Sequence, residues 1–261
     1  MDRDSGGLPH PVEPVTPEAP RALRRVIFQQ FWRDAAFLHW SVPPEAVAPL
    51  LPAGTRPDVM DGTTPVGLIG FGMESLGLGA GPPVPYLGRF PEINVRLYSV
   101  DRLGRRGIVF LSLDCPRLLP VLTANAVFGL PYRWASCARH TTAGRIGYSV
   151  RPYAPGRRPV SRFGVAIGDP LPQPSAADHF LTARWGLHVR ARGRTWYLPN
   201  QHRPWPLHSA ELLVCDQDLL RRSGLPDGLV DPAAPESVLY SPGVQTRFGL
   251  PEALPSERRH R

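Results

Sequence analysis

The sequence predicts a single α+β domain built around a largely antiparallel β-sheet or barrel. Apolar residues recur in short runs along the body of the chain, several with the alternation of a half-buried strand. Proline and glycine, at 33 and 25 of 261 residues, fall largely between these runs and supply turns. This spacing favours a β-rich body with many turns over a helical bundle.

The two ends of the chain differ from its middle. Residues 1–20 are punctuated by closely spaced prolines and carry little apolar surface, so we expect a disordered tail. Residues 251–261 are expected to form a charged tail. The hydrophobic content of 42% is enough for a core, and we expect residues 21–250 to form one domain without internal repeats.

Local signals place the elements in chain order. A first-turn proline predicts a short helix from Pro44, Asp61-Gly62 predicts a turn between strands, and Ser175 with Asp178 predicts a helix start. The expected elements are a helix in the first half of 21–40, an extended run at 36–42, the helix from Pro44, strands within 55–61 and 65–76, a hairpin at 90–100 and 108–113, a helix at 121–128, strands at 134–140, 145–153 and 160–167, a helix at 176–184, and strands at 187–192, 195–198 and 210–215.

Two further segments have a specific expectation. Segment 77–89 is rich in glycine and proline, and a loop of this length within a compact domain is often functional. We expect it to lie over the mouth of a cavity. Residues 238–240 are expected to make only a short apolar contact.

The strand that begins at Phe90 has two chemically different faces. Its apolar face is formed by Ile93, Val95 and Leu97. Its other face carries Glu92, Asn94, Arg96 and Tyr98. A Gly/Pro-marked turn at 128–134 presents Tyr132 and Arg133, and we expect this turn and the polar face to look into one cavity.

The charge of the chain gives little support to nucleic-acid binding. The net charge is +8, and all 30 basic residues are arginine because the chain contains no lysine. The arginines are scattered, with the densest clusters near the two ends, and no basic helix or aromatic-basic motif accompanies them. A nucleic-acid partner is therefore disfavoured, and a homo-oligomer is left open.

Cysteine spacing and the missing sequence motifs limit the other function classes. Cys115, Cys137 and Cys215 are far apart, which favours reduced thiols and a cytoplasmic location over disulfides or zinc. No signal peptide and no apolar run of about 20 residues is present, so no membrane association is expected. The glycine-rich nucleotide motifs and the zinc-protease and serine-hydrolase motifs are absent, so we expect neither a cofactor nor a metal.

Six motifs, in this order, resemble the uncharacterised DUF2071 family, to which the YqjF-like proteins belong. The motifs are Phe37-Leu38-His39-Trp40, Leu50-Leu51-Pro52, Phe90-Pro91-Glu92-Ile93-Asn94-Val95-Arg96, Leu111-Ser112-Leu113-Asp114, Gly129-Leu130-Pro131-Tyr132 and His202-Arg203-Pro204-Trp205-Pro206-Leu207. That family is similar to acetoacetate decarboxylase. The resemblance implies a cone-shaped antiparallel β-barrel with short flanking helices and an internal pocket.

The resemblance does not carry the decarboxylase chemistry with it. Those enzymes have two adjacent lysines after a Gly-Phe-Pro-like segment, and the first forms a Schiff base. Tyr132 and Arg133 stand at these positions here. Arginine cannot lose its proton to form an imine, and the chain has no lysine, so Schiff-base decarboxylation is excluded.

The candidate site residues each have a functional and a structural interpretation. Glu92 matches a decarboxylase glutamate and is the candidate acid/base, or else it forms a buried ion pair with Arg96. Arg96, Tyr132 and Arg133 are candidates for binding a carboxylate or enolate. The structural alternative is packing at the cavity wall and pairing with an acid.

Asn94 and His39 lie within the resembling motifs and are added to the ligand-binding set, although a structural role through hydrogen bonds within the barrel is the favoured interpretation of both. Asp114 is likewise expected to be a hydrogen-bonded structural residue. Two hypotheses follow. The chain is a lyase- or isomerase-like enzyme acting on a small carboxylate- or carbonyl-containing ligand. Alternatively, it is a non-catalytic ligand-binding or interaction protein on the same scaffold.

Overall fold

The computed structural model describes residues 10–79, 81, 82, 84, 88–118, 129–153 and 160–255. The helix expected at 121–128 and part of segment 77–89 lie outside the described residues. Strands dominate the rest, and the helices are short. The strands are β1 (Phe28–Val42), β2 (Thr55–Pro57), β3 (Thr64–Leu78), β4 (Phe90–Asp101), β5 (Arg106–Cys115), β6 (Tyr132–Thr142), β7 (Arg145–Pro152), β8 (Ser161–Pro170), β9 (Gly186–Ala191), β10 (Arg194–His202), β11 (His208–Asp216), β12 (Ser237–Phe248) and β13 (Glu252–Ala253).

The helices lie at the ends and sides of the strands. They are α1 (Pro44–Val47), the 3-10 helix η1 (Ala48–Leu50), α3 (Ala176–Thr182) and α4 (Leu219–Arg222). Helix α3 begins as predicted, because Ser175 and Asp178 form a reciprocal capping box. Helix α1 has Pro44 in its first turn, where a missing N–H costs nothing.

Within the described residues, nine strands close into a barrel in the order β5-β6-β7-β8-β11-β12-β1-β3-β4, and β4 returns to pair with β5. The predicted barrel with short flanking helices is thereby confirmed. Its pairing is mixed rather than wholly antiparallel, because β5 runs parallel to β6 and to β9. Antiparallel neighbours need only tight turns, whereas these parallel pairs follow longer connections.

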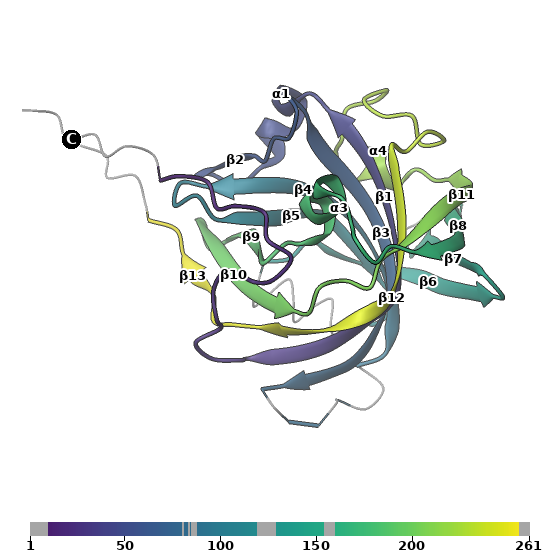
Figure 1. The fold of residues 1–261 in the computed structure, drawn as a ribbon, viewed down its shortest axis with the longest axis horizontal. Coiled ribbons are helices and arrows are strands. Elements are labelled where there is room, and N and C mark those ends of the chain that lie inside the picture. Colours follow the sequence, from purple (N-terminus) through teal and green to yellow (C-terminus); the bar gives the residue numbers. More distant parts are fainter. Residues whose placement is uncertain are drawn as a thin grey trace, which may run out of the picture.

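The sheet forks at β5 and again at β12. Strand β5 pairs with β9 at Ile108 and with β6 from Leu113 to Cys115. Strand β12 pairs with β11 near Leu239 and with β10 near Thr246. Figure 1 shows the result, with β9 and β10 on one side, β6, β7, β8 and β11 on the other, and β12, β1 and β3 running between them.

Because of the fork, the strands shared by both branches are buried on two faces. Alternate residues of β1 enter different cores, since side chains of a strand alternate between its faces. Leu38 packs in the core inside the nine-stranded barrel, together with Val95, Tyr148 and Phe163. The opposite face contributes to a second core, around Phe37, Ile69, Phe71 and Phe90, and a third, around Tyr98, Ile108, Leu187 and Phe248.

Two expectations about secondary structure were wrong. The first half of 21–40 contains no helix, and β1 is a strand from Phe28 onward. Its apolar pattern is irregular because the strand bulges at Asp34, whose φ is +53° and whose carboxylate accepts a hydrogen bond from Tyr240.

The stretch at 238–240 is part of the twelve-residue strand β12 rather than a short contact. Pro242 and Gly243 interrupt its sequence pattern. Gly243 has a φ of +126° and lies against the backbone of Trp32, so this close approach requires glycine. The strand pairs with β1 on both sides of this point.

Both ends of the described chain contact the barrel. The N–H of Glu13 donates to the carbonyl oxygen of Gly104 at 2.9 Å. The indole N–H of Trp185 donates to the carbonyl oxygen of Thr16 at 3.2 Å. Strand β13 pairs with β10 at Trp196 and Tyr197. The expected domain limits at residues 21 and 250 stay predictions.

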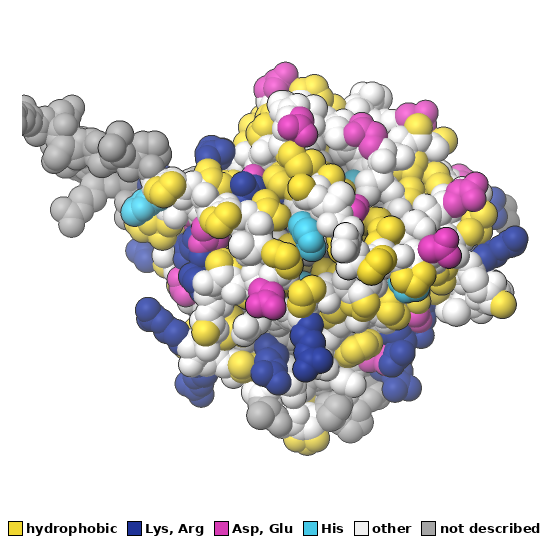
Figure 2. All heavy atoms as spheres, in the orientation of Figure 1, with side chains coloured by type: hydrophobic (Ala, Val, Ile, Leu, Met, Phe, Trp, Pro, Cys, Tyr) yellow, Lys and Arg dark blue, Asp and Glu magenta, His cyan; other side chains and the backbone are white. Residues whose placement is uncertain are grey.

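The surface has mixed charge. On the face in Figure 2, basic side chains are interspersed with acidic, apolar and uncharged ones and do not form one continuous stripe. No helix among the described residues is long and apolar enough to span a membrane.

The close approach at Gly243 makes a prediction about stability. Gly243→Ala would place a methyl group against the carbonyl oxygen of Trp32, whereas Gly144→Ala, at a φ of +71°, would meet nothing within 4 Å. We expect Gly144→Ala to lower the free energy of unfolding by about 1 kcal/mol. Gly243→Ala should cost at least about 2 kcal/mol more, because overpacking adds to the strain. Urea unfolding of both variants measures this, and equal losses would show that the approach is not tight.

Candidate functional site

The best-defined polar contact on β4 joins Glu92 to Tyr132. Glu92 is buried, with 2% of its surface exposed. The phenol of Tyr132, the first residue of β6, donates to Glu92 Oε2 at 2.6 Å. Tyr132 also packs against the second core, beside Phe90 and Cys115. The strand and the turn expected to share a cavity are therefore in direct contact.

The segment before β6 delivers Tyr132 to this position. Gly129 has a φ of +68°, and a Cβ there would lie 2.7 Å from the carbonyl oxygen of Arg190. Glycine is needed at this point for the turn and for the close contact with β9. The N–H of Leu113 then donates to the carbonyl oxygen of Pro131 at 3.1 Å, which fixes the start of β6 beside β5.

Burial determines the ionisation of Glu92. Removal from water raises the pKa of its carboxyl group to about 7, because the charged form loses its hydration. The hydrogen bond from Tyr132 and the positive charge of Arg96 act in the opposite direction and limit the rise of the pKa. At neutral pH both forms of the carboxyl group are therefore populated.

Asn94 and Arg96 continue the same face of β4. The Nε of Arg96 donates to Asn94 Oδ1 at 2.9 Å, and the guanidinium lies 5.4 Å from the centre of the Phe110 ring. Asn94 is fully buried, and its Nδ2 makes no close hydrogen bond to a described residue. It lies near enough to the Glu92 carboxyl to favour the carboxylate and lower its pKa, so Asn94 belongs to the same polar group as Glu92 and Arg96.

His39 reaches the same side of the sheet from β1. Its Nε2 lies 2.7 Å from the hydroxyl oxygen of Tyr98, and that hydroxyl donates to the carbonyl oxygen of Leu181 at 2.9 Å. His39 Nε2–H must therefore be the donor to Tyr98. Burial lowers the pKa of His39 to about 3, so the ring is neutral and holds Tyr98 in place.

Arg133 lies on the other face of the sheet from Glu92. It follows Tyr132 in β6, and its register partner is Asp114, which lies opposite Ile93. Its Nη2 donates to the carbonyl oxygen of Arg222 at 3.0 Å. The structure thus brings Glu92, Asn94, Arg96 and Tyr132 to one face and places Arg133 apart from them.

Asp114 differs from its expected role as a hydrogen-bonded structural residue. It is 1% exposed, and neither carboxylate oxygen has a hydrogen-bond partner among the described residues. Burial raises the pKa of Asp114 to about 6, and the positive charges of Arg133 and Arg222 limit that rise of the pKa. The alternation of side chains along a strand predicts that Asp114 faces the core inside the nine-stranded barrel. It does not reveal whether a hydrogen-bond partner for the carboxylate is present there.

Some residues of the site were not singled out by sequence reasoning. Tyr98 links His39 to α3, and its place on the polar face of β4 was the available signal. Asp58 accepts hydrogen bonds from Arg106 and Arg184, which are 48 and 126 residues away. No local pattern predicts contacts over such distances along the chain.

The cysteines and the histidine of the last motif have structural surroundings. Burial raises the pKa of the Cys115 thiol to about 12, so it is not an activated nucleophile. Burial lowers the pKa of His202 to about 4, and its ring packs among Trp32, Trp185 and Trp205. In the part of the chain that the structure describes, no three His, Cys, Asp or Glu side chains cluster as a metal site.

Cavities formed by described residues include two of about 620 and 550 Å³ and two smaller ones of about 420 and 160 Å³. Glu92, Arg96 and Tyr132 are not among the residues that line these four. The smallest of these four, of about 160 Å³, is lined by His39 and by Phe180 and Leu181 of α3.

The pKa of Glu92 predicts a characteristic pH dependence of stability. The folded state binds this proton more tightly than the unfolded chain, whose ordinary pKa is 4.5. The contribution of Glu92 to the free energy of unfolding therefore falls as pH rises from about 4.5 to about 7 and levels off above that range. Glu92→Gln removes this term, so its stability relative to the natural chain should increase by about 3 kcal/mol across the window.

Urea unfolding followed by tryptophan fluorescence at a series of pH values tests this difference. Asp114 titrates in an overlapping range in both proteins, so the comparison removes its own contribution and leaves only its coupling to Glu92, whose pKa its charge raises. A stability difference that stays constant between pH 4.5 and 7 would mean that Glu92 ionises normally.

Comparison with known proteins agrees with this architecture. A model of the family DUF2071, described as an uncharacterized conserved protein, matches residues 29–245. The uncharacterized protein YqjF of Bacillus subtilis (strain 168) is 30% identical over 227 residues, which cover 83% of this chain and 91% of that protein.

Solved structures extend the comparison to the fold. Acetoacetate decarboxylase from Legionella pneumophila superposes with a TM-score of 0.59 at 13% identity over 92% of both chains. The enduracididine biosynthesis enzyme MppR complexed with pyruvate superposes with a TM-score of 0.57 at 17% identity, over 90% of this chain and 93% of that one. At such low identity these likenesses show the fold alone. The match over residues 29–245 and the identity to YqjF show that this chain belongs to the DUF2071 family, as its six motifs predicted.

Proposed function

We propose that the polar face of β4 binds a small ligand with a carboxylate or carbonyl group, and that Glu92 transfers a proton on it. The observation that carries this proposal is the buried Glu92 carboxyl, whose pKa is raised to about 7 and whose Oε2 accepts a hydrogen bond from Tyr132. A pKa close to the working pH is what general acid–base catalysis requires. The reaction class would be lyase- or isomerase-like.

Each neighbouring group has a role in this proposal. As a carboxylate, Glu92 accepts a proton from the carbon beside a carbonyl group. As a carboxylic acid, it returns that proton to the same or another atom of the ligand. Arg96 and the Nδ2 of Asn94, which makes no close hydrogen bond to a described residue, would stabilise the enolate oxygen or a carboxylate group. Tyr132 holds Glu92 in one orientation.

A 2-oxo acid is the ligand class we propose first. The polar face pairs a guanidinium, which favours a carboxylate, with an acid/base group, which suits a neighbouring carbonyl. The structurally similar enzyme MppR is described in complex with pyruvate. The proposal needs no Schiff base, because the chain has no lysine.

A second candidate is a non-catalytic ligand-binding protein. The contacts Tyr132–Glu92 and Arg96–Asn94 favour it, because these groups partly satisfy one another without a ligand.

A compartment that keeps thiols reduced, such as the cytoplasm, remains part of either proposal. Its support is that Cys115, Cys137 and Cys215 are unpaired and at least partly buried.

Pyruvate in D₂O tests both candidates. We expect the protein to bind pyruvate and to accelerate the loss of its methyl proton signal in NMR spectra. Glu92→Gln should bind pyruvate but lose the exchange, since it cannot take up a proton. Arg96→Gln should weaken binding about tenfold, because a charge-assisted contact is lost.

Glu211→Gln is the matched control, because Glu211 is exposed on β11. It should behave as the natural chain does. Binding of pyruvate without exchange would favour the non-catalytic candidate. Exchange that survives in Glu92→Gln, or the absence of both binding and exchange across small 2-oxo acids, would contradict the enzymatic proposal.

A further inference from the structure

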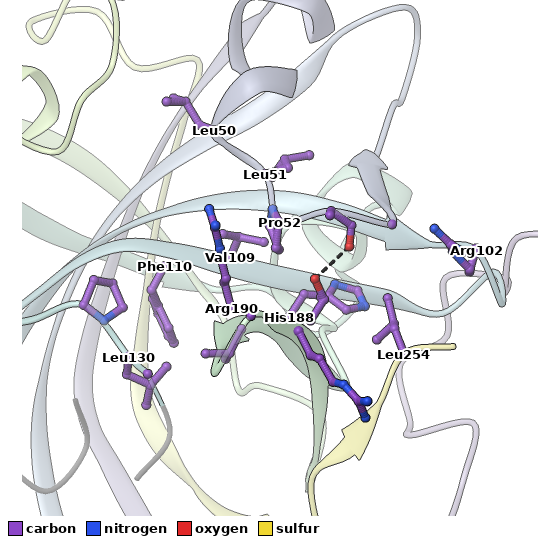
Figure 3. Close-up of a pocket in the computed structure, with 18 of the residues that line it drawn as sticks. Leu50, Leu51, Pro52, Arg102, Val109, Phe110, Leu130, His188, Arg190 and Leu254 are labelled. Atoms are coloured by element: carbon purple, nitrogen blue, oxygen red, sulfur yellow. Dashed lines mark hydrogen bonds between the residues drawn. The ribbon is translucent and has the colours of Figure 1, made fainter. Parts of the chain in front are cut away.

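A cavity of about 620 Å³ lies outside the Glu92 site, between the β9–β10 hairpin and the segment that follows η1. Figure 3 shows Val109, Phe110, His188 and Arg190 lying between Leu50 and Leu51 on one side and Leu130 on another, with Arg102 and Leu254 at the far end. This volume is in the range of pockets that bind small organic molecules.

The cavity is a consequence of the fork in the sheet. Strand β5 pairs with β9 only at Ile108 and with β6 only from Leu113. No described strand pairs with this edge of β5 between Ile108 and Leu113, and Val109 and Phe110, which lie in this gap, line the cavity. The cavity is therefore the space between the diverging strands β6 and β9, with apolar residues of β5 at its base.

The walls of the cavity are tied together by the protein itself. The hydroxyl of Thr195 on β10 donates to the carbonyl oxygen of Ala53 at 2.7 Å, as Figure 3 shows. The N–H of Arg102 donates to the carbonyl oxygen of Gly54 at 3.2 Å. These bonds connect the β9–β10 hairpin and the β4–β5 turn to the same segment, so the cavity is held open before any ligand arrives.

The lining has an unbalanced charge. It contains Arg102, Arg190 and Arg194 and no aspartate or glutamate. Arg190 and Arg194 are exposed and form no ion pair with the described residues. The remaining lining is largely apolar and consists of Leu50, Leu51, Val109, Phe110, Leu130 and Leu254 together with prolines and glycines.

We infer that this cavity binds an amphiphilic organic anion, with the apolar body over Val109 and Leu130 and the anionic head at Arg190 and Arg194. Guanidinium groups bind carboxylates and phosphates in a bidentate manner, and the surrounding leucines exclude water from an alkyl or aryl body. The inference does not rest on the function proposed for Glu92, because Glu92, Arg96 and Tyr132 do not line this cavity.

Calorimetric titration with decanoate tests the inference on the full chain. Decanoate should bind, whereas acetate, which lacks the body, and decanol, which lacks the charge, should each bind at least about tenfold more weakly. Titration with decyl phosphate then distinguishes a phosphate head from a carboxylate head. Binding of either the carboxylate or the phosphate supports the inference if decanol binds at least about tenfold more weakly.

Variants locate the binding site. Arg190→Gln combined with Arg194→Gln should weaken decanoate binding by about tenfold or more, since charge-assisted contacts are lost. Both side chains are exposed, so the fold should persist, and circular dichroism verifies this. Arg192→Gln is the matched control, because Arg192 is exposed on the same hairpin but does not line the cavity.

Three results would overturn the inference. They are the absence of binding by both decanoate and decyl phosphate, affinity for the anion that binds which is unchanged in the double variant, and equal weakening by Arg192→Gln. The last result would mean that decanoate responds only to the general positive charge of the chain.

Discussion

The burial of β4 on both of its faces is the constraint on which the rest of the structure depends. One face completes the core of the nine-stranded barrel with Ile93, Val95 and Leu97. The other carries polar groups, which must find partners within the protein because water is excluded. The forked sheet meets this need, since β6 supplies Tyr132 to Glu92 and α3 supplies a carbonyl oxygen to Tyr98. The same fork opens the cavity beside the β9–β10 hairpin.

Burial is the main cause of the raised pKa of both buried carboxyl groups, Glu92 and Asp114, and the side chains of β6 limit the rise on either face of the sheet. Tyr132 and Arg133 are adjacent, so their side chains point to opposite faces. The neutral phenol faces Glu92, and the cation faces Asp114. The hydrogen bonds from Tyr132 and Asn94 and the charge of Arg96 favour the carboxylate of Glu92 but do not outweigh the cost of burial, and the pKa of Glu92 stays near 7.

Local patterns in the sequence account for much of the fold and part of the site. The strict alternation after Phe90 was sufficient to identify β4 and its polar face, and the family motifs implied the barrel. The sequence could not reveal the bulge at Asp34 or the contact of Gly243 with Trp32, because both are set by a neighbouring strand. For the same reason, periodicity alone did not separate Arg133 from Glu92. The register of β6 beside β5 makes that separation, and it depends on the turn at Gly129.

The central claim is that Glu92 remains partly protonated at neutral pH within an intact barrel. Its most direct test is a ¹³C NMR titration of the protein labelled at glutamate carboxyl carbons, with Glu92→Gln used to assign the signal. We expect one glutamate that titrates near pH 7 and disappears in the variant. Tyr132→Phe should move that midpoint to higher pH, because it removes the hydrogen bond that favours the carboxylate. A Glu92 signal that titrates at the ordinary value of 4.5, and is unmoved by Tyr132→Phe, would contradict the account.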